Sequence, residues 1–493
     1  MPNEAPTSDR LKALGDGRLD VLVIGGGIVG AGVARDAAAR GLKTLLVEQA
    51  DFASGTSSRS SRLLHGGLRY LAQGRIGLVR EASTEKMLLS RLAPHLCSPL
   101  PFVFPAWRGS GWSRWKLSLG VRIYDLLCGG HNLGRSSTLG PEAVREQIPG
   151  LRATGLNGAV RYFDALTNDS RLVLDTLRSA VGAGASVMNY TTYVSGELID
   201  GAWRCVVQDR LNGARADVQA RTIVNATGAW APGLPHSEVR LRLTKGIHLV
   251  VDRTRLPVSD AVVLPEGDRI LFVIPWGERV ILGTTDTDYS EDPGAVRTEA
   301  VDIEYVLRVV NGAFPEARIT PGDVIATWAG VRPLVAPAKS RPGAPSDTSR
   351  GHAIRMAEPG WFDVVGGKLT TYRLMGEQTV DQVGRFLGMR LPRSLTAKVP
   401  LARPEHSGVL PPPVDPGAVR DCCQNEWAVH LDDVLVRRTS WLYYHPDRTA
   451  LVTQVTGWMG DSLGWDATRR VAEIDRLRDV TEFPLATGAS TGP

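Results

Sequence analysis

Short apolar runs alternate with helical patterns along the chain. Residues 19–24 follow a polar stretch and form the first apolar run, which predicts a buried strand. The alanine-rich pattern that stops at Gly41 predicts a helix, and residues 42–48 predict a second strand. Residues 220–228 repeat the strand pattern much later in the chain. Strands that alternate with helices in this way predict an α/β fold with a parallel sheet.

Two long stretches interrupt this alternation, at about residues 91–160 and 236–325. Strand-like apolar runs fill the second of them, so we predict that both belong to a largely β domain inserted into the first domain, the whole region spanning residues 19–395. Residues 396–417 are proline-rich, as linkers are, and residues 418–485 predict a small helical C-terminal domain. Residues 1–19 have the composition of a loose tail and residues 336–350 that of an exposed loop.

Composition excludes several classes of protein. The net charge of +5 over 493 residues is too small to indicate a nucleic-acid partner, and no nucleic-acid-binding motif is evident. The five cysteines form no CxxC pair, so neither a disulfide framework nor a metal site is expected. The N-terminal residues lack the apolar core of a signal peptide, and the longest uncharged apolar run, residues 21–34, is shorter than the roughly 20 residues that span a bilayer. We therefore expect a cytoplasmic protein without a membrane-spanning segment.

A glycine-rich turn between the first strand and the first helix is the strongest local signal. Gly25 permits a tight turn, Gly27 lets the backbone approach a pyrophosphate, and Gly30 allows close packing of helix on strand. The helix N-terminus, which begins at Ile28, offers N–H groups to an anion. Glu48 ends the second strand, where a carboxylate accepts ribose hydroxyls and repels a 2′-phosphate. The turn predicts the ADP-ribose half of FAD or NAD, and the lack of a second complete fingerprint disfavours a separate nicotinamide domain.

Four further motifs combine glycines, small hydroxyls and cations. A helix N-terminus with Lys368 beside it would stabilise the negative charge of a reduced flavin. Taken singly, each motif is also typical of a polar loop or a packed strand. The motifs are TSSRSSR followed by HGGLRY at residues 56–70, KGIH at 245–248, GVRP at 330–333 and GGKLTT at 366–371.

The cations and histidines of these motifs suggest a chemistry. Arg69, Arg332 and Lys368 lie among glycines with few adjacent acids, and three cations suit a doubly charged phosphate. The alternative is that some of them neutralise a cofactor's pyrophosphate. Oxidation of a carbinol also requires a base for the hydroxyl proton, for which a histidine is suited. His65 and His248 are the candidates, and the sequence does not rank them.

Together these motifs resemble the FAD-dependent (aerobic) glycerol-3-phosphate dehydrogenases and the related glycerophosphate oxidases over residues 20–395. HGGLRY, IPW…GTTD and GGKLTTYR in combination are specific to that family, whereas the glycine turn and the ATG turn at residues 226–228 occur in many flavoproteins. The cap departs from the family, because the proline-rich residues 401–417 replace a longer helical stretch. The resemblance therefore does not extend to the oligomer contacts of the cap, and a homodimer is a prediction.

The resemblance implies a FAD-binding Rossmann-like domain of the amino-acid-oxidase type, an inserted β-sheet substrate domain and a helical C-terminal cap. It also implies hydride transfer from sn-glycerol 3-phosphate to FAD, which yields dihydroxyacetone phosphate, and transfer of the electrons to a membrane quinone. By position, Arg69, Tyr70, Arg332 and Lys368 would bind the substrate, and His65, His248 and Arg332 would face the carbinol. The implied cofactor-binding residues are Gly25, Gly27, Ile28, Gly30, Glu48, Thr56, Ser57, Ser58, Ser61, Gly228, Gly367, Lys368, Leu369 and Thr370.

Two alternative activities are compatible with the sequence, and residues 107–127 predict a distinctive surface segment. Electron transfer to oxygen, as in an oxidase, stays open, as does an amine or amino-acid oxidase activity on the same fold. Residues 107–116 mix tryptophans with cations ahead of the leucine-rich residues 117–127, a composition typical of an element in a bilayer interface or of a helix packed on its own domain. The resemblance favours peripheral attachment to the inner face of the cell membrane.

Overall fold

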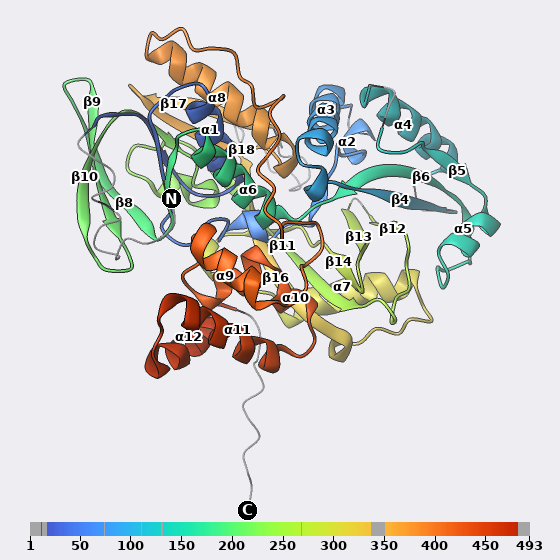
Figure 1. Ribbon diagram of the computed structural model, residues 1–493. Coiled ribbons are helices and arrows are strands. Elements are labelled where there is room, and N and C mark those ends of the chain that lie inside the picture. The colour runs from blue at the N-terminus through green and yellow to red at the C-terminus, as the bar shows by residue number, and fades with distance from the viewer. Residues whose placement is uncertain are drawn as a thin grey trace, which may run out of the picture.

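The computed structural model describes residues 11, 17–72, 74–109, 111–129, 132–267, 269–336 and 351–481, without the side chains of Arg69 and Ala72. Most of the predicted N-terminal tail and of the predicted loop at 336–350 lies outside the described residues. The described residues form two sheets in different parts of the molecule, with helices packed around them (Figure 1).

The first sheet has a parallel centre. Its central strand β1 pairs in parallel with β2 on one side and with β10 on the other, and its strands follow the order β17-β18-β10-β1-β2-β7. β1 and β2 are almost wholly apolar and buried, as strands covered on both faces are. These pairings confirm the predicted α/β fold. The strands are β1 (Leu19–Ile24), β2 (Thr44–Val47), β7 (Ser186–Met188), β8 (Thr191–Ile199), β9 (Ala202–Asp209), β10 (Arg215–Asn225), β17 (His352–Glu358) and β18 (Trp361–Gly366).

Helix α1 is buried along ten of its twelve residues, and α6 and α8 both contact it. Its small side chains permit this close packing, since a Cβ on Gly32 would lie 2.9 Å from the carbonyl oxygen of Tyr372. The helices are α1 (Ile28–Ala39), α6 (Asp169–Gly182) and α8 (Tyr372–Phe386).

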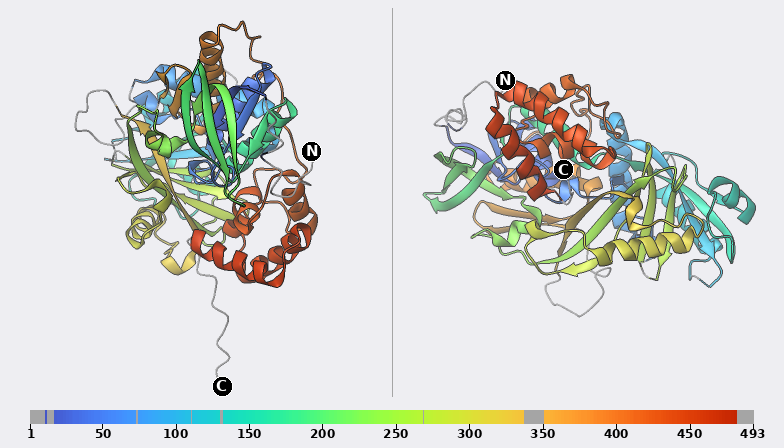
Figure 2. Two further views of the ribbon diagram at one scale, coloured as in Figure 1. Left: turned by 90° about the vertical axis from the view of Figure 1, so that its left-hand side faces the viewer. Right: turned by 90° about the horizontal axis from the view of Figure 1, so that it is seen from below.

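The second sheet has ten strands in the order β15-β11-β14-β13-β12-β4-β6-β3, with β16 on β11 and β5 on β6. Its strands come from three separate parts of the chain, and α7 (Ala300–Ala313) packs along it, as Figure 2 shows in yellow. The strands are β3 (Leu63–Leu64), β4 (Ser98–Trp107), β5 (Ser137–Leu139), β6 (Leu156–Leu166), β11 (Leu241–Asp252), β12 (Ala261–Glu266), β13 (Arg269–Trp276), β14 (Arg279–Gly283), β15 (Thr287–Tyr289) and β16 (Val324–Val335).

Helix α4 (Arg114–Leu127) lies at the edge of the molecule and has two different apolar faces. One face is buried against β6 and its neighbours, whereas Trp115, Leu119 and Leu126 on the other are 66%, 54% and 72% exposed. Trp107, which composition placed in the surface element, is instead a buried residue of β4. The exposed apolar surface therefore begins at Trp115. The neighbouring helices are α2 (Arg69–Ala72), α3 (Ile76–Leu92) and α5 (Pro141–Gln147).

Among the described residues, every helix is too short or too polar to cross a membrane.

The segment after α8 runs along the first domain before the C-terminal helices begin. Residues 387–415, all of them described, form no helix or strand. Their backbone is nevertheless bound, because the Val399 carbonyl accepts a 2.5 Å hydrogen bond from Arg35 and the Ala402 N–H donates to Ser179. The helices that follow are α9 (Pro416–Asn425), a π-helical turn (Asp433–Arg438), α10 (Trp441–Tyr444), α11 (Arg448–Leu463) and α12 (Ala467–Val480).

Buried ion pairs join the C-terminal helices to the first domain. Asp51 accepts hydrogen bonds from both Arg437 and Arg438, including one of 2.9 Å from Nη2 of Arg438. Arg171 of α6 forms a two-pronged pair with Glu426, at 2.6 and 2.7 Å. Because the side chains of all five residues are almost fully buried, each charge depends on its partner for compensation.

Asp51→Ala removes the carboxylate that two buried arginines share. We expect it to lower the free energy of unfolding by about 3–5 kcal/mol, because the buried guanidinium of Arg438 loses its carboxylate partner, whereas Arg437 keeps its pairs with Asp432 and Asp433. Urea denaturation of the purified protein, followed by tryptophan fluorescence, measures this loss. The matched control is Asp288→Ala, whose partner Arg242 lies in an exposed pair that we expect to contribute about 0–1 kcal/mol. Equal losses for the two variants would contradict the prediction.

Candidate functional site

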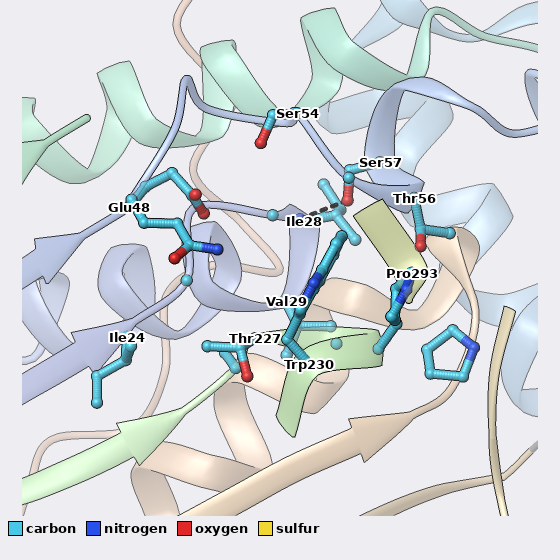
Figure 3. Close-up of a pocket in the computed structure, with 18 of the residues that line it drawn as sticks. Ile24, Ile28, Val29, Glu48, Ser54, Thr56, Ser57, Thr227, Trp230 and Pro293 are labelled. Atoms are coloured by element: carbon cyan, nitrogen blue, oxygen red, sulfur yellow. Dashed lines mark hydrogen bonds between the residues drawn. The ribbon is translucent and has the colours of Figure 1, made fainter. Parts of the chain in front are cut away.

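A cavity of about 490 Å³ lies at the carboxyl ends of the parallel strands β1, β2 and β10. Figure 3 shows the turn at Ile28 and Val29, the Glu48 carboxylate and the Trp230 ring around it. Open α/β sheets bind ligands at this edge, where helix N-termini and strand ends meet.

The glycine turn brings the backbone closer than side chains would allow. Gly25 has a φ of +108°, and a Cβ there would lie 2.7 Å from the carbonyl oxygen of Ala226. A Cβ on Gly30 would lie 1.9 Å from the carbonyl oxygen of Gly25. The Ile28 N–H, at the start of α1, donates a 3.0 Å hydrogen bond to the Ser57 hydroxyl. The turn therefore aims a helix N-terminus, with a hydroxyl beside it, into the cavity.

Glu48 lies at the other end of the turn and lines the same cavity. One carboxylate oxygen accepts a 2.7 Å hydrogen bond from the Gly26 N–H, and the other accepts a 2.9 Å bond from the Ala50 N–H. Burial raises the pKa of this carboxyl, and the two N–H donors oppose that rise. The side chain is thus held in one orientation with its oxygens at the cavity wall, as a ribose-binding carboxylate requires.

Most of the predicted cofactor-binding residues meet in this cavity. Four of them do not line it. Gly30 packs against the turn at Gly25, and Ser58 lines a small neighbouring cavity. Ser61 lines the second cavity, described below, and the Thr370 hydroxyl accepts a hydrogen bond from the His65 N–H. The residues that line the cavity are Gly25, Gly27, Ile28, Glu48, Thr56, Ser57, Gly228, Gly367, Lys368 and Leu369.

Sequence reasoning missed some of the wall. Residues 191–193, at the start of β8, line the cavity without belonging to any glycine or phosphate motif. Trp230 also lines it, and the GAW that follows the ATG turn was a signal that could have identified it.

A second cavity, of about 160 Å³, lies against the second sheet, where residues of β4, β6, β13 and β16 and of the segment 61–70 line it. One part of its wall is polar and contains Ser61, His65, Tyr70 and Arg332, and another part is aromatic. Lys368 lines the first cavity, while its Nζ lies 4.3 Å from the centre of the Tyr70 ring, which lines the second. Lys368 therefore stands where the two cavities approach each other. The aromatic residues are Phe102, Phe104, Tyr162 and Phe272.

Arg332 is held in place by its neighbours in the GTTD motif. Its Nη2 donates a 2.8 Å hydrogen bond to the Thr284 hydroxyl, and its Nη1 lies 3.3 Å from the Asp286 carboxylate. A Cβ on Gly246 would lie 2.4 Å from Nη2, so the glycine makes room for the guanidinium. The acid beside Arg332 differs from the prediction of few adjacent acids, because Asp286 is distant in sequence and is brought there by the fold.

The two candidate histidines take different places. His65 lines the second cavity, and its backbone N–H donates a 3.1 Å hydrogen bond to Thr370. His248 is 2% exposed, with Nε2 2.8 Å from the Ser61 hydroxyl and its ring stacked on Trp328. Burial, together with the charges of Arg332 and Arg62, lowers the pKa of His248 well below its ordinary value, so the ring is neutral at neutral pH.

Two other cations of the sequence motifs, Arg69 and Lys245, lie in different surroundings. The backbone of Arg69 lies in α2, but its side chain is outside the described residues. Lys245, which precedes His248 in the KGIH motif, forms ion pairs of 2.6 and 2.8 Å with Glu299 and Asp302. Residues three apart on a strand point to opposite faces, so Lys245 anchors α7 rather than joining His248.

A group of three potential metal ligands lies away from both cavities. His406, Cys422 and Glu426 approach within 4.8 Å of one another. Both carboxylate oxygens of Glu426 already accept hydrogen bonds from Arg171, which accounts for the buried charge without an ion.

Comparison with known proteins finds relatives over most of the chain. Residues 20–373 match the family described as FAD dependent oxidoreductase, and residues 412–470 match the C-terminal domain of alpha-glycerophosphate oxidase. Glycerol-3-phosphate dehydrogenase 2 of Mycobacterium bovis is 36% identical, over 94% of this chain and 88% of its own length. The aerobic glycerol-3-phosphate dehydrogenase of Staphylococcus epidermidis is 35% identical, over 76% of this chain and 69% of its own.

Solved structures agree with the sequence relatives. The glycerol-3-phosphate dehydrogenase of Bacillus halodurans, complexed with FAD, superimposes with a TM-score of 0.78 at 27% identity, covering 97% of this chain and 98% of that one. Glycine oxidase from Geobacillus kaustophilus, at 21% identity and a TM-score of 0.58 over 78% of this chain and 99% of that one, shares the fold. The chain therefore belongs to the FAD-dependent oxidoreductases, and among them to the family of the FAD-dependent glycerol-3-phosphate dehydrogenases.

Proposed function

We propose that this enzyme oxidises sn-glycerol 3-phosphate to dihydroxyacetone phosphate and passes the electrons to a quinone. The observation that carries the proposal is the second cavity, which Arg332 and His65 line and which Lys368 of the first cavity approaches at the Tyr70 ring. Two cations and a histidine are the groups that a phosphorylated carbinol needs. The names of the relatives point to the same substrate.

The residues present fit FAD. Glu48 would accept the ribose hydroxyls, and the N-terminus of α1 with Ser57 would face the pyrophosphate. The segment from Gly367 to Leu369 would face the flavin, where the charge of Lys368 favours the reduced form. When bound, FAD supplies the acceptor for the hydride of the carbinol carbon.

The substrate's phosphate is assigned to Arg332 and Lys368, with Tyr70 beside them. The contacts of Arg332 with Thr284 and Asp286 fix its planar guanidinium before substrate arrives, so little entropy is lost when it binds an anion. Asp286 offsets part of the positive charge of Arg332, and its contact holds the guanidinium in place when no substrate is bound.

His65 is the better placed of the two candidate bases. His65 lines the second cavity, whereas His248 is buried and bonds to the Ser61 hydroxyl. We assign removal of the hydroxyl proton to His65. Neutral His248 accepts or donates a hydrogen bond at Ser61 and keeps that hydroxyl oriented toward the cavity.

The aromatic wall of the second cavity supports a quinone as the electron acceptor. A small polar phosphate ester makes no use of Phe102, Phe104 or Phe272, whereas a planar apolar ring packs well against such side chains. Oxygen as the acceptor would require no such surface.

The exposed face of α4 supports attachment to a lipid surface. Trp115, Leu119, Ile123 and Leu126 share that face, and the exposed cations Lys116 and Arg122 flank it. An amphipathic helix of this kind lies in the interface of a bilayer with its apolar face inward. A quinone acceptor is itself a membrane lipid, so the two proposals are consistent.

Anaerobic titration of the purified yellow protein with sn-glycerol 3-phosphate tests the substrate and the acceptor together. We expect the flavin absorption band to bleach, and to recover quickly with a soluble quinone analogue but slowly in air. Fast recovery in air would make the enzyme an oxidase. Bleaching by glycine, sarcosine or a D-amino acid, with none by glycerol 3-phosphate, would show that the substrate class is wrong.

Arg332→Ala removes one of the two proposed phosphate-binding cations. We expect the rate constant of flavin reduction at low substrate concentration to fall on the order of a hundredfold, because a charge-assisted contact is lost, while the bound FAD per protein stays unchanged. Stopped-flow absorbance and the flavin-to-protein ratio measure the two quantities. Arg242→Ala, on the exposed end of neighbouring β11, is the matched control and should retain the normal rate. Loss of the yellow colour would assign Arg332 to the cofactor instead.

Replacement of Trp115, Leu119 and Leu126 by alanine removes most of the apolar face of α4. We expect sedimentation with phosphatidylglycerol and phosphatidylethanolamine vesicles to weaken about tenfold or more, since each large apolar side chain contributes about 1.5–3 kcal/mol when fully buried. Activity with a soluble dye should be spared. Val301 and Val471, which are 66% and 61% exposed on other helices, provide the alanine control. Unchanged sedimentation of the triple variant would disprove the assignment.

A further inference from the structure

The short loop that carries His65 depends on hydrogen bonds from two distant segments. The His65 N–H donates to the Thr370 hydroxyl at 3.1 Å. The next N–H, that of Gly66, donates to the phenol oxygen of Tyr124 at 2.7 Å. Thr370 belongs to the segment that faces the cofactor cavity, whereas Tyr124 lies on α4 with its side chain fully buried.

There is no free space around this second contact. A Cβ on Gly66 would lie 2.6 Å from the Tyr124 oxygen and 2.4 Å from the Ser83 hydroxyl oxygen. The phenol therefore touches the backbone directly, and the glycine is what allows it to do so. A buried N–H that loses such an acceptor costs about 1–3 kcal/mol, so the loop conformation depends on the phenol oxygen.

The Tyr124 hydroxyl is itself held by a buried ion pair. It donates a short hydrogen bond to Asp164, whose same oxygen accepts a 2.9 Å bond from Lys86. Lys86 also donates to the Asn132 side chain at 2.8 Å and to the Phe163 carbonyl at 3.1 Å. With its proton directed to Asp164, the phenol oxygen presents a lone pair to Gly66. Burial and Asp164 raise the pKa of Tyr124 well above its ordinary value, which keeps the hydroxyl protonated.

We propose that Tyr124 is a positioning residue for the oxidation reaction, which holds the backbone at Gly66 so that His65 stays at the substrate cavity. This inference rests on the proposed function, in which His65 removes the hydroxyl proton. Asp164 lines the same cavity as His65, so the support reaches the site from the core of the second sheet. A displacement of about 1 Å at a catalytic group costs up to a hundredfold in rate, and a relaxed Gly66 would displace the residue next to it.

Tyr124→Phe tests the proposal in the FAD-loaded protein because it removes one oxygen and keeps the ring. Tyr190→Phe is the matched control: its hydroxyl also donates to a buried carboxylate, Asp433 at 2.6 Å, but at the contact with the C-terminal helices. Two readouts are compared between the variants. One is the limiting rate of anaerobic flavin reduction at saturating glycerol 3-phosphate, and the other is hydrogen–deuterium exchange of peptides that cover residues 64–70.

We expect Tyr124→Phe to slow the limiting rate about tenfold to a hundredfold with little change in the substrate concentration for half-maximal rate. In the same variant, hydrogen–deuterium exchange should rise in residues 64–70 and remain normal in α11. Tyr190→Phe should change neither the limiting rate of flavin reduction nor the exchange of residues 64–70. Equal limiting rates for the two variants, or exchange that rises throughout the chain, would overturn the proposal. If glycerol 3-phosphate does not reduce the wild-type flavin, the proposed function fails, and the exchange data alone still decide whether Tyr124 holds the loop.

Discussion

The close backbone contact at the end of β1 is the constraint on which the rest of the molecule depends. A Cβ on Gly30 would collide with the carbonyl of Gly25, and one on Gly25 would collide with that of Ala226. The turn from β1 into α1 therefore fits against the end of β10 only because both residues lack side chains. That packing directs the N-terminus of α1 to the carboxyl edge of the sheet, and the Glu48 carboxylate is tied to the same turn through the Gly26 N–H. The cofactor cavity is the space that this contact leaves open.

The second cavity, the proposed substrate site, has a different origin, because it is assembled from strands that are far apart in sequence. Antiparallel pairing of β11 with β16 places Thr244 opposite Arg332 and His248 opposite Trp328. β14 then pairs with the other edge of β11, which brings the following Thr284 to the guanidinium of Arg332. Register along three strands, rather than any local motif, therefore fixes the relative positions of Arg332, Thr284 and His248.

This difference explains how much of the molecule could be predicted from the sequence. The first strand, turn and helix, with Glu48 at the end of the next strand, are determined by neighbouring residues, and the predicted nucleotide-binding turn matches the structure. Asp286 beside Arg332 depends on sheet register, and Tyr124 beside Gly66 depends on how a distant helix packs, so neither has a local signal. For Lys245 and His248 the local signal is sufficient: they are three residues apart on one strand, so their side chains point to opposite faces of the sheet.

The C-terminal helices are joined to the cofactor cavity by the same kind of long-range contact. Asp51, which holds Arg437 and Arg438, follows Ala50, whose N–H fixes the Glu48 carboxylate. The loop that orients the Glu48 carboxylate, to which we assign the ribose, is therefore held at one end by the glycine turn and at the other by two buried arginines. Because a buried carboxylate between two guanidinium groups cannot move without exposing unpaired charge, docking of these helices restricts the loop at Glu48. Among the described residues, the C-terminal helices contribute none to the wall of this cavity, and the contact with Asp51 links them to it.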